Sequence, residues 1–216
     1  MGRHYEVDGK LYPSVTTVLS VIRKPFLERW RGDIGNEAAD YIMHEAGDLG
    51  SEVHDIAEAI NRGEPWAAAT YETHLMAEAY EKWFTANVKE VVYVEHAIVN
   101  TVYGYAGRLD LCAVIRGDRL PSLLDIKTGG LYPDAFLQLA AYQKALPIKT
   151  KRRLIIHIDK KAPGKLAAKE AERDLETDYR MFLYCLELYR YFNRSKPKAN
   201  QIVKIQGGEP NVSISA

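Results

Sequence analysis

GRLDLCAVIRGDRLPSLLDIKTG, residues 107–129, is the stretch that decides the fold. It holds two apolar runs on either side of a polar turn at residues 116–121, which is typical of a β-hairpin. Near-continuous apolar runs indicate strands that are covered on both faces. Three charged residues nevertheless lie within or beside these runs, namely Asp110, Asp125 and Lys127. Burying three charges is costly unless they have a task, so they are the first candidates for a functional site.

The register of this hairpin decides which charges meet. Side chains alternate between the two faces of a strand, so Asp125 and Lys127 share a face. If residues 115 and 122 face each other, Asp110 lies opposite Lys127, whereas a shift of two residues places it opposite Asp125. Both registers bring two carboxylates and an ammonium group together. Adjacent carboxylates repel unless a cation joins them, and a hard divalent ion with oxygen ligands would do so. The alternative is an exposed sheet face with a cross-strand salt bridge.

The rest of the chain predicts helices, then three strands, a helix, a strand and a final helix, around one central sheet. A small hairpin is expected at residues 4–13 around Asp8-Gly9. Gly47 and Gly50 are expected to interrupt the chain before a helix. The expected helices cover residues 14–19, a segment from Pro25, 51–61, 70–86, 133–146 and 165–193, and the expected strands cover residues 91–99, 105–115, 122–128 and 152–159.

Composition excludes several classes of protein. The 216 residues, 47% of them hydrophobic, suffice for one core. No segment approaches the ~18 apolar residues of a membrane span, and the first residues lack the apolar core of a signal peptide. We therefore expect a cytoplasmic protein, in a bacterial or phage-infected cell or in an organellar matrix, without a membrane partner. Two cysteines are too few for an iron–sulfur cluster or a four-cysteine zinc site.

Charge is unevenly distributed although the formal net charge is zero. Residues 1–148 hold seven more acidic than basic residues, and residues 149–204 hold eight more basic than acidic residues. A basic segment of this kind suits a polyanionic partner, although a solvated surface explains the charge equally well. The candidate phosphate contacts flank the strand expected at residues 152–159: Lys149, Lys151, Arg152, Arg153, Lys160 and Lys161.

Four motifs in order resemble the PD-(D/E)XK nuclease superfamily, and most closely its RecB-like branch, which includes phage-type and mitochondrial genome maintenance-type exonucleases. G-R-L-D supplies Asp110, and D-I-K-T-G supplies Asp125 and Lys127. The helix that follows carries Q-x-x-x-Y, and an upstream helix carries G-x-x-x-H. YPSVTTVL, residues 12–19, resembles the opening segment of the family. These motifs are matched by Gln138 with Tyr142 and by Gly50 with His54.

The resemblance implies an α/β fold with a restriction-endonuclease-like core, a central mixed β-sheet flanked by helices, and N-terminal helical additions. It implies a single nuclease domain over residues 1–216. This domain would comprise a mostly helical part (1–90), a catalytic sheet (91–160), a long helix (165–193) and a weakly ordered tail (197–216). The cofactor would be Mg²⁺ or Mn²⁺ without an iron–sulfur cluster, because the four cysteines of some relatives are missing.

The resemblance also assigns roles to residues. The metal ligands would be His54, Asp110, Asp125 and the carbonyl of Ile126, and imidazole would favour Mn²⁺. Lys127 would stabilise the pentacoordinate phosphate, and Gln138 would hold Lys127 or the attacking water. The remaining candidates are Tyr142 on a DNA phosphate, Glu95 near the metal, and Ser14 and Thr16 on DNA.

These roles predict a metal-dependent DNA exonuclease of recombination, repair or phage DNA metabolism, acting on single-stranded or frayed ends. A single-strand annealing or binding protein is a candidate partner. The N-terminal helices would roof the site with an acidic surface (Glu37, Asp40, Glu45, Asp48 and Glu52). The alternatives are a DNA-binding recombination module that has kept the fold, an endonuclease of the same superfamily, and a structural protein in which Asp110→Asn changes nothing.

Overall fold

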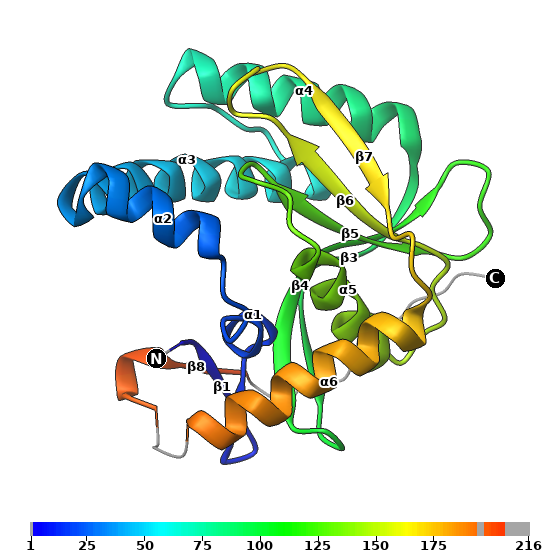
Figure 1. Ribbon diagram of the computed structural model, residues 1–216. Coiled ribbons are helices and arrows are strands. Elements are labelled where there is room, and N and C mark those ends of the chain that lie inside the picture. Colours follow the sequence, from blue (N-terminus) through cyan, green and yellow to red (C-terminus); the bar gives the residue numbers. More distant parts are fainter. Residues whose placement is uncertain (1, 194–196, 206–216) are drawn as a thin grey trace.

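The centre of the molecule is a five-stranded mixed sheet, shown in Figure 1. The structure, a computed structural model, describes residues 2–193 and 197–205. The strands lie in the order β3-β4-β5-β6-β7, and only β5 and β6 are parallel neighbours. Their bounds are β3 Val88–Asn100, β4 Tyr105–Ile115, β5 Ser122–Lys127, β6 Arg153–Ile158 and β7 Leu166–Glu170. The predicted α/β class, with a central mixed sheet flanked by helices, is confirmed.

Helices cover both faces of this sheet. One face packs against α1 (Val15–Leu19), α5 (Asp134–Ala145) and α6 (Leu175–Phe192), where Cys112, Leu123 and Ile155 join their core. The other packs against α3 (Asn36–Arg62) and α4 (Tyr71–Asn87), where Leu111, Leu124 and Ile156 are buried. Successive residues of β4 and β5 therefore point into two different cores. This arrangement explains why the opening sequence is apolar at almost every position.

The hairpin of β4 and β5 adopts the second of the two predicted registers. Leu111 pairs with Leu124, and Ala113 pairs with Ser122. Continuing this register by one residue places Asp110 opposite Asp125, so the prediction of Asp110 opposite Lys127 is wrong. The connection between the two strands spans residues 116–121, as predicted, and Asp118 within it accepts hydrogen bonds from Lys151 and Arg152.

Helix α3 runs without interruption through Gly47 and Gly50, contrary to the break expected there. A glycine inside a helix costs only about 1 kcal/mol relative to alanine, which burial of the apolar side of α3 outweighs. Gly50 is placed where the helix approaches the end of β5, since a Cβ atom there would lie 3.3 Å from Thr128 Oγ1. The glycine thus permits a close approach, and the helix continues on both sides of it.

The single helix expected at residues 165–193 is two elements. Residues 166–170 form β7, an edge strand antiparallel to β6, and α6 begins only at Leu175. Asp174 caps α6 by accepting a hydrogen bond from the backbone of Thr177 at 2.8 Å. Pairing with β6 has overridden the helical propensity of the sequence LAAKE, which is a non-local effect.

A second sheet unites the two ends of the described chain. Its order is β2-β1-β8, with β1 at His4–Val7, β2 at Lys10–Pro13 and β8 at Ile202–Lys204. The hairpin of β1 and β2 turns at Asp8-Gly9 as predicted, and both residues have positive φ. Strand β8, which follows the 3₁₀ helix η1 (Ala199–Gln201), contradicts the weakly ordered tail for residues 197–205. Residues 206–216 of that prediction lie outside the described residues.

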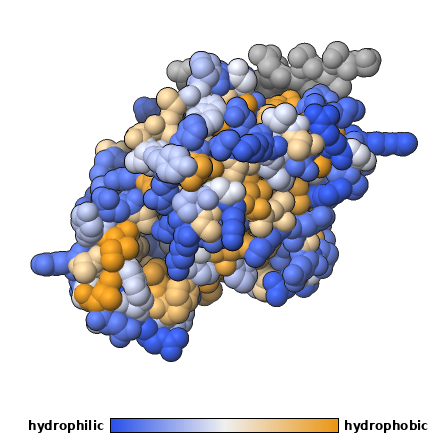
Figure 2. Space-filling view, turned by 90° about the horizontal axis from the view of Figure 1, so that it is seen from above, coloured by the Kyte–Doolittle hydropathy of each residue, from blue (hydrophilic) through white to orange (hydrophobic). Residues whose placement is uncertain are grey.

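Helix α2 (Pro25–Ile34) contacts α3, and the two helices project together from the body in Figure 1. It begins at Pro25 as predicted, but none of its residues is buried. Figure 2 shows hydrophobic residues interspersed with hydrophilic ones over the face seen from above. No helix in the described parts of the chain is long and apolar enough to cross a membrane.

Candidate metal centre and active site

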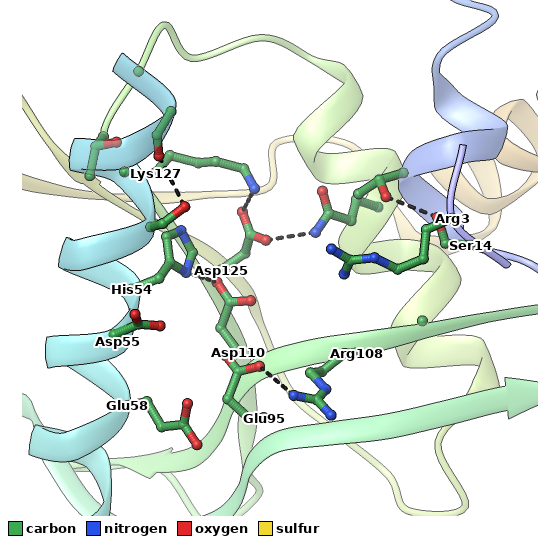
Figure 3. A pocket seen from close by; sticks show the side chains of 18 of the residues that line it. Arg3, Ser14, His54, Asp55, Glu58, Glu95, Arg108, Asp110, Asp125 and Lys127 are labelled. Atoms are coloured by element: carbon green, nitrogen blue, oxygen red, sulfur yellow. Dashed lines mark hydrogen bonds and ion pairs between the residues drawn. The ribbon is translucent and has the colours of Figure 1, made fainter. Parts of the chain in front are cut away.

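Three carboxylates lie level with one another across β3, β4 and β5. Glu95 lies between the pairs Val94–Leu111 and His96–Leu109, which places it opposite Asp110. Asp110 in turn accepts a hydrogen bond from the backbone N–H of Ile126 at 2.8 Å, next to Asp125. Figure 3 shows these carboxylates one after another beside α3, and all three line a cavity of about 570 Å³.

Helix α3 adds an imidazole to this row. His54 Nδ1 lies 3.6 Å from Asp110 Oδ2. His54, Glu95 and Asp110 each offer one ligand atom, and these three atoms lie within 4.8 Å of one another. The G-x-x-x-H motif therefore meets the hairpin in space, as predicted, because α3 crosses the end of β5 at Gly50.

Asp125 is the most buried of the carboxylates, with 1% of its surface exposed. Its Oδ1 accepts a hydrogen bond from Gln138 Nε2 at 2.8 Å, and its Oδ2 lies 2.8 Å from Lys127 Nζ. Gln138 Nε2 also donates to Tyr142 Oη at 3.3 Å. Gln138 therefore orients Asp125 here, whereas the sequence predicted that it would hold Lys127 or water.

Electrostatics leave the row short of positive charge. Burial raises the pKa of Asp125 to about 6; the charge of Lys127 offsets burial only in part, and the charge of Asp110 adds a smaller rise. Burial and the charge of Asp110 raise the pKa of Glu95 to about 7. Burial alone would lower the pKa of Lys127, but Asp125 and Asp110 reverse the sign and raise it. A site that makes carboxylates resist ionisation while keeping its lysine charged is one that an added cation would stabilise.

Glu95 is held in an unusual backbone conformation. Its φ is 46°, in the left-handed region, although it lies inside a strand. A residue with a side chain pays of order 1–3 kcal/mol for such a conformation, which persists where the surroundings enforce it. This distortion, close to the register shift between Val91 and Tyr93, aims the Glu95 carboxylate at Asp110.

Gly107 of the G-R-L-D motif has a packing reason of its own. A Cβ atom at this position would lie 2.5 Å from Tyr142 Cε1. The ring of Tyr142 therefore rests on the bare backbone of β4, beside the row of carboxylates. Burial and the charges of Asp125 and Asp110 raise the pKa of Tyr142 well above its usual value. Tyr142 thus keeps its proton and can serve as a donor.

The cavity has one acidic and one basic wall (Figure 3). Asp55 and Glu58 lie on the α3 side, and Arg3 and Arg108 lie on the opposite side. Both arginines were missed from the sequence. Arg108 stands inside G-R-L-D, and Arg3 precedes the strand that pairs with residues 10–13, so the predicted hairpin would have placed it beside the opening segment. Ser14 and Thr16 line the cavity as well.

The six basic residues predicted as phosphate contacts lie outside the cavity. Arg153 is 5% exposed and pairs with the buried Asp178 at 2.7 Å, so it is removed from the candidate DNA contacts. Lys151 and Arg152 hold Asp118 at the end of β6 farthest from Lys127. None of the six basic candidates lines the cavity, although Lys160 lines a neighbouring one beside α3. Contacts of Lys149 and Lys161 with DNA stay predictions.

The acidic roof is also arranged differently. Glu52 accepts hydrogen bonds from Ala69 N–H and from Thr73 Oγ1, so it faces α4 and not the cavity. Asp40 pairs with Arg31 of α2 at 2.7 Å. The α3 carboxylates that do line the cavity are Asp55 and Glu58, one and two helical turns after Ser51.

Fold and site together define an α/β protein whose mixed sheet carries an acidic cavity suited to a cation. No family model and no curated protein matches the chain. Among solved structures it is similar to SSO0001, at 20% identity over 81% of this chain and 75% of that one, with a TM-score of 0.38. It is also similar to the alkaline exonuclease LHK-Exo from Laribacter hongkongensis, at 18% identity over 85% and 92%, with a TM-score of 0.37.

A second structure of LHK-Exo, in complex with dAMP, matches at 18% identity over 85% of this chain and 92% of that one, with a TM-score of 0.38. Identities and TM-scores of this size do not define a function. The function is therefore argued below from the residues of the cavity.

Proposed function

We propose that this protein is a divalent-metal-dependent nuclease that hydrolyses DNA phosphodiester bonds from strand ends. The observation that carries the proposal is the row of Glu95, Asp110 and Asp125, joined by His54 and Lys127 in one cavity. Five carboxylates and three basic side chains line that cavity, so negative charge is in excess. A structural salt bridge needs no such excess, and an exposed acidic surface would not bury Asp125.

The donor set fits Mg²⁺ or Mn²⁺. Carboxylate oxygens suit both ions, and the imidazole of His54 adds a nitrogen that favours Mn²⁺. Asp125 Oδ2 lies 2.8 Å from Lys127 Nζ, yet burial still raises the pKa of Asp125, so a bound cation would relieve the cost of its charge. We assign His54, Asp110 and Asp125 as ligands and raise Glu95 to the same rank, because its carboxylate lies within reach of His54 and Asp110. The carbonyl of Ile126 stays a predicted ligand.

A cation bound here would supply the usual chemistry of such ions: it lowers the pKa of a water molecule and neutralises charge on the phosphate. The side chains do the rest. Lys127 places an ammonium group where negative charge develops on the phosphate. Gln138 fixes the carboxylate of Asp125, and the protonated Tyr142 offers its O–H to a phosphate oxygen of the substrate. Hydrolysis of this kind leaves 5′-phosphates, as the resemblance implies.

The two unlike walls of the cavity support a single strand as substrate. Arg3 and Arg108 attract the phosphates to one wall, and Asp55 and Glu58 repel them from the other. A strand so confined enters most easily from an end. Roles in recombination, repair or phage DNA metabolism, and a single-strand annealing or binding partner, stay predictions.

The test compares linear with covalently closed single-stranded DNA of one sequence, each incubated with Mn²⁺ and then with EDTA. We expect the linear DNA to be degraded, the circle to persist, and EDTA to abolish cleavage. Equal degradation of both would show an endonuclease of the same superfamily. Binding without cleavage in Mn²⁺ or Mg²⁺ would show a DNA-binding module that has kept the fold.

A further inference from the structure

Residues 2 and 3 are tied firmly to α1, although they begin the described chain. The carbonyl of Arg3 accepts hydrogen bonds from Ser14 N–H at 2.9 Å and from Thr17 Oγ1 at 3.0 Å. Gly2 lies so close to Thr17 that a Cβ atom would be 2.1 Å from its Oγ1. These contacts fix the backbone of residues 2 and 3 beside the opening segment, residues 12–19. They therefore also fix the Cα atom from which the Arg3 side chain extends.

The other end of the chain holds this strand from its far side. Strand β8 pairs in parallel with β1, in the register His4 with Ile202 and Tyr5 with Val203. Ile205 N–H adds a hydrogen bond to the carbonyl of Glu6 at 3.0 Å. β1 is therefore an inner strand, with β2 on one side and β8 on the other.

Arg3 differs from the other basic residues of the cavity in having no partner. Lys127 pairs with Asp125 at 2.8 Å, and Arg108 lies 3.7 Å from Glu95. The Arg3 guanidinium makes no hydrogen bond or ion pair with any residue in the described parts of the chain, and Figure 3 shows it pointing into the cavity. A guanidinium is a planar fork of donors that matches the oxygens of a phosphate.

We propose that Arg3 binds a phosphate of the substrate strand next to the scissile phosphate, and that β8 keeps Arg3 in position by bracing β1. The inference rests on the proposed function for the identity of the ligand. It makes the Arg3 side of the basic wall depend on the small sheet, in which β1 meets β8. Arg3 is a substrate-binding residue, and Ile205 is a positioning residue that acts through β1.

Binding measured without cleavage tests the role of Arg3. The probe is a fluorescent single-stranded oligonucleotide, with Ca²⁺ in place of Mn²⁺, and affinity is read by anisotropy over a range of salt. Arg3→Gln should weaken binding about tenfold, the size of a lost charge-assisted contact. It should also reduce the salt slope by about 0.7, the value for one phosphate on a single strand. Arg3→Lys should fall between, because it keeps the charge and loses the fork.

The matched control is Arg119→Gln, an exposed arginine in the connection between β4 and β5. This change should leave affinity and salt slope as in the wild type. Unchanged affinity in Arg3→Gln, or equal losses in both variants, would overturn the assignment of Arg3.

Oligonucleotides with one neutral methylphosphonate linkage locate the contact. In the wild type, neutralising the linkage next to the cleaved one should weaken binding. In Arg3→Gln the same neutral linkage should cost nothing further, because its partner is already gone. A penalty that is the same in both proteins at every linkage would overturn the proposed position.

Strand β8 is tested by Ile205→Pro, which removes the N–H that bonds to Glu6, with Ile205→Val as its control. We expect Ile205→Pro to weaken oligonucleotide binding, and to add nothing when combined with Arg3→Gln. Full affinity in a folded Ile205→Pro protein, or additive losses, would overturn the role of β8. Wild-type protein that binds the probe but does not cut it in Mn²⁺ would refute the nuclease alone. Wild-type protein that binds no oligonucleotide would refute both.

Discussion

Two charged clusters lie at opposite ends of β5 and β6, and they differ in how far their carboxylates are neutralised by nearby cations. At one end Asp118 is held by Lys151 at 2.5 Å and by Arg152 at 2.9 Å. At the other end, Asp125 pairs with Lys127 at 2.8 Å, Asp110 lies 3.6 Å from His54, and Glu95 lies no nearer than 3.7 Å to Arg108. Glu170, 3.9 Å from Arg152, completes the first cluster, so two carboxylates face two cations there. The second cluster has no such balance.

The direction of the pKa shifts expresses this difference. The hydrogen bond from Lys151 is the main reason that the pKa of Asp118 is lowered. Burial raises the pKa of Asp125 to about 6 and that of Glu95 to about 7. A carboxylate that ionises easily in the folded state is already satisfied. A carboxylate that resists ionisation lacks a sufficient positive charge nearby. This contrast is why we assign the cluster around Asp125 and Glu95, and not the one around Asp118, as the site for a ligand.

The largest expected effect is on cleavage. Asp110→Asn or Asp125→Asn should each reduce the rate of DNA hydrolysis about 100-fold or more, because each removes a charge that the cation and the developing phosphate charge require. Lys127→Ala should do the same. Circular dichroism should show an intact fold. The comparison is Asp118→Asn, which should leave cleavage per folded molecule unchanged; near wild-type cleavage by Asp125→Asn would remove the site.

A second balanced pair should affect stability and not cleavage. Arg153 and Asp178 are both buried and lie 2.7 Å apart. Asp178→Asn leaves a buried guanidinium without its countercharge, which should lower the free energy of unfolding by about 3–5 kcal/mol. Chemical denaturation measures this loss. The double variant Arg153→Met with Asp178→Leu should recover most of it, and a lack of recovery would show that the pair does more than balance charge.

The sequence sufficed for whatever is local in the chain. Asp110, Asp125 and Lys127 stand out because charge inside an apolar strand is visible without a structure. The caps and turns were equally legible, since Ser14, Asp8-Gly9 and Pro25 act on their immediate neighbours. The convergence of Asp110, Asp125 and Lys127 followed from strand alternation, which is a local rule, whereas His54 and Glu95 were predicted from the family resemblance.

Non-local pairing accounts for what the sequence did not predict. The segments that form β7 and β8 have no strong pattern, and they become strands because β6 and β1 offer them an edge. The sequence around Arg153 is typical of a surface cation, and its burial follows only from the tertiary contact with Asp178 of α6. The predicted hairpin could have placed Arg3 beside the opening segment, but its lack of a countercharge among the described residues depends on how α1 and the small sheet pack against the cavity. Compensation of a charge is a property of tertiary structure.

The third effect concerns the choice of ion. His54→Ala removes the one nitrogen ligand and should weaken Mn²⁺ binding by at least about tenfold, the lower range for residues that support a metal site. Ca²⁺ prefers oxygen ligands and should be affected less. Calorimetric titration of both ions into the wild type and the variant measures the two losses. Equal losses, or none, would take His54 out of the metal shell.

The smallest effect is on stability as a function of pH. The direction of the pKa shift, raised for Asp125 and lowered for Asp118, again distinguishes the two clusters. In the folded protein the pKa of Asp125 is raised to about 6 and that of Glu95 to about 7, above the usual values of 3.8 and 4.5 for these side chains. The folded protein therefore holds these protons more tightly than the unfolded chain does, and it loses stability as pH rises from about 4 to about 7. The melting temperature of metal-free protein should fall by a few degrees across this window, at about 2–4 °C per kcal/mol.

Asp125→Asn should flatten the fall, and Mn²⁺ should stabilise the wild type more at pH 7.5 than at pH 5. Asp118→Asn, whose parent carboxylate has a lowered pKa, should leave the fall in place. If Asp125→Asn kept the wild-type dependence on pH, the unbalanced charge would lie elsewhere.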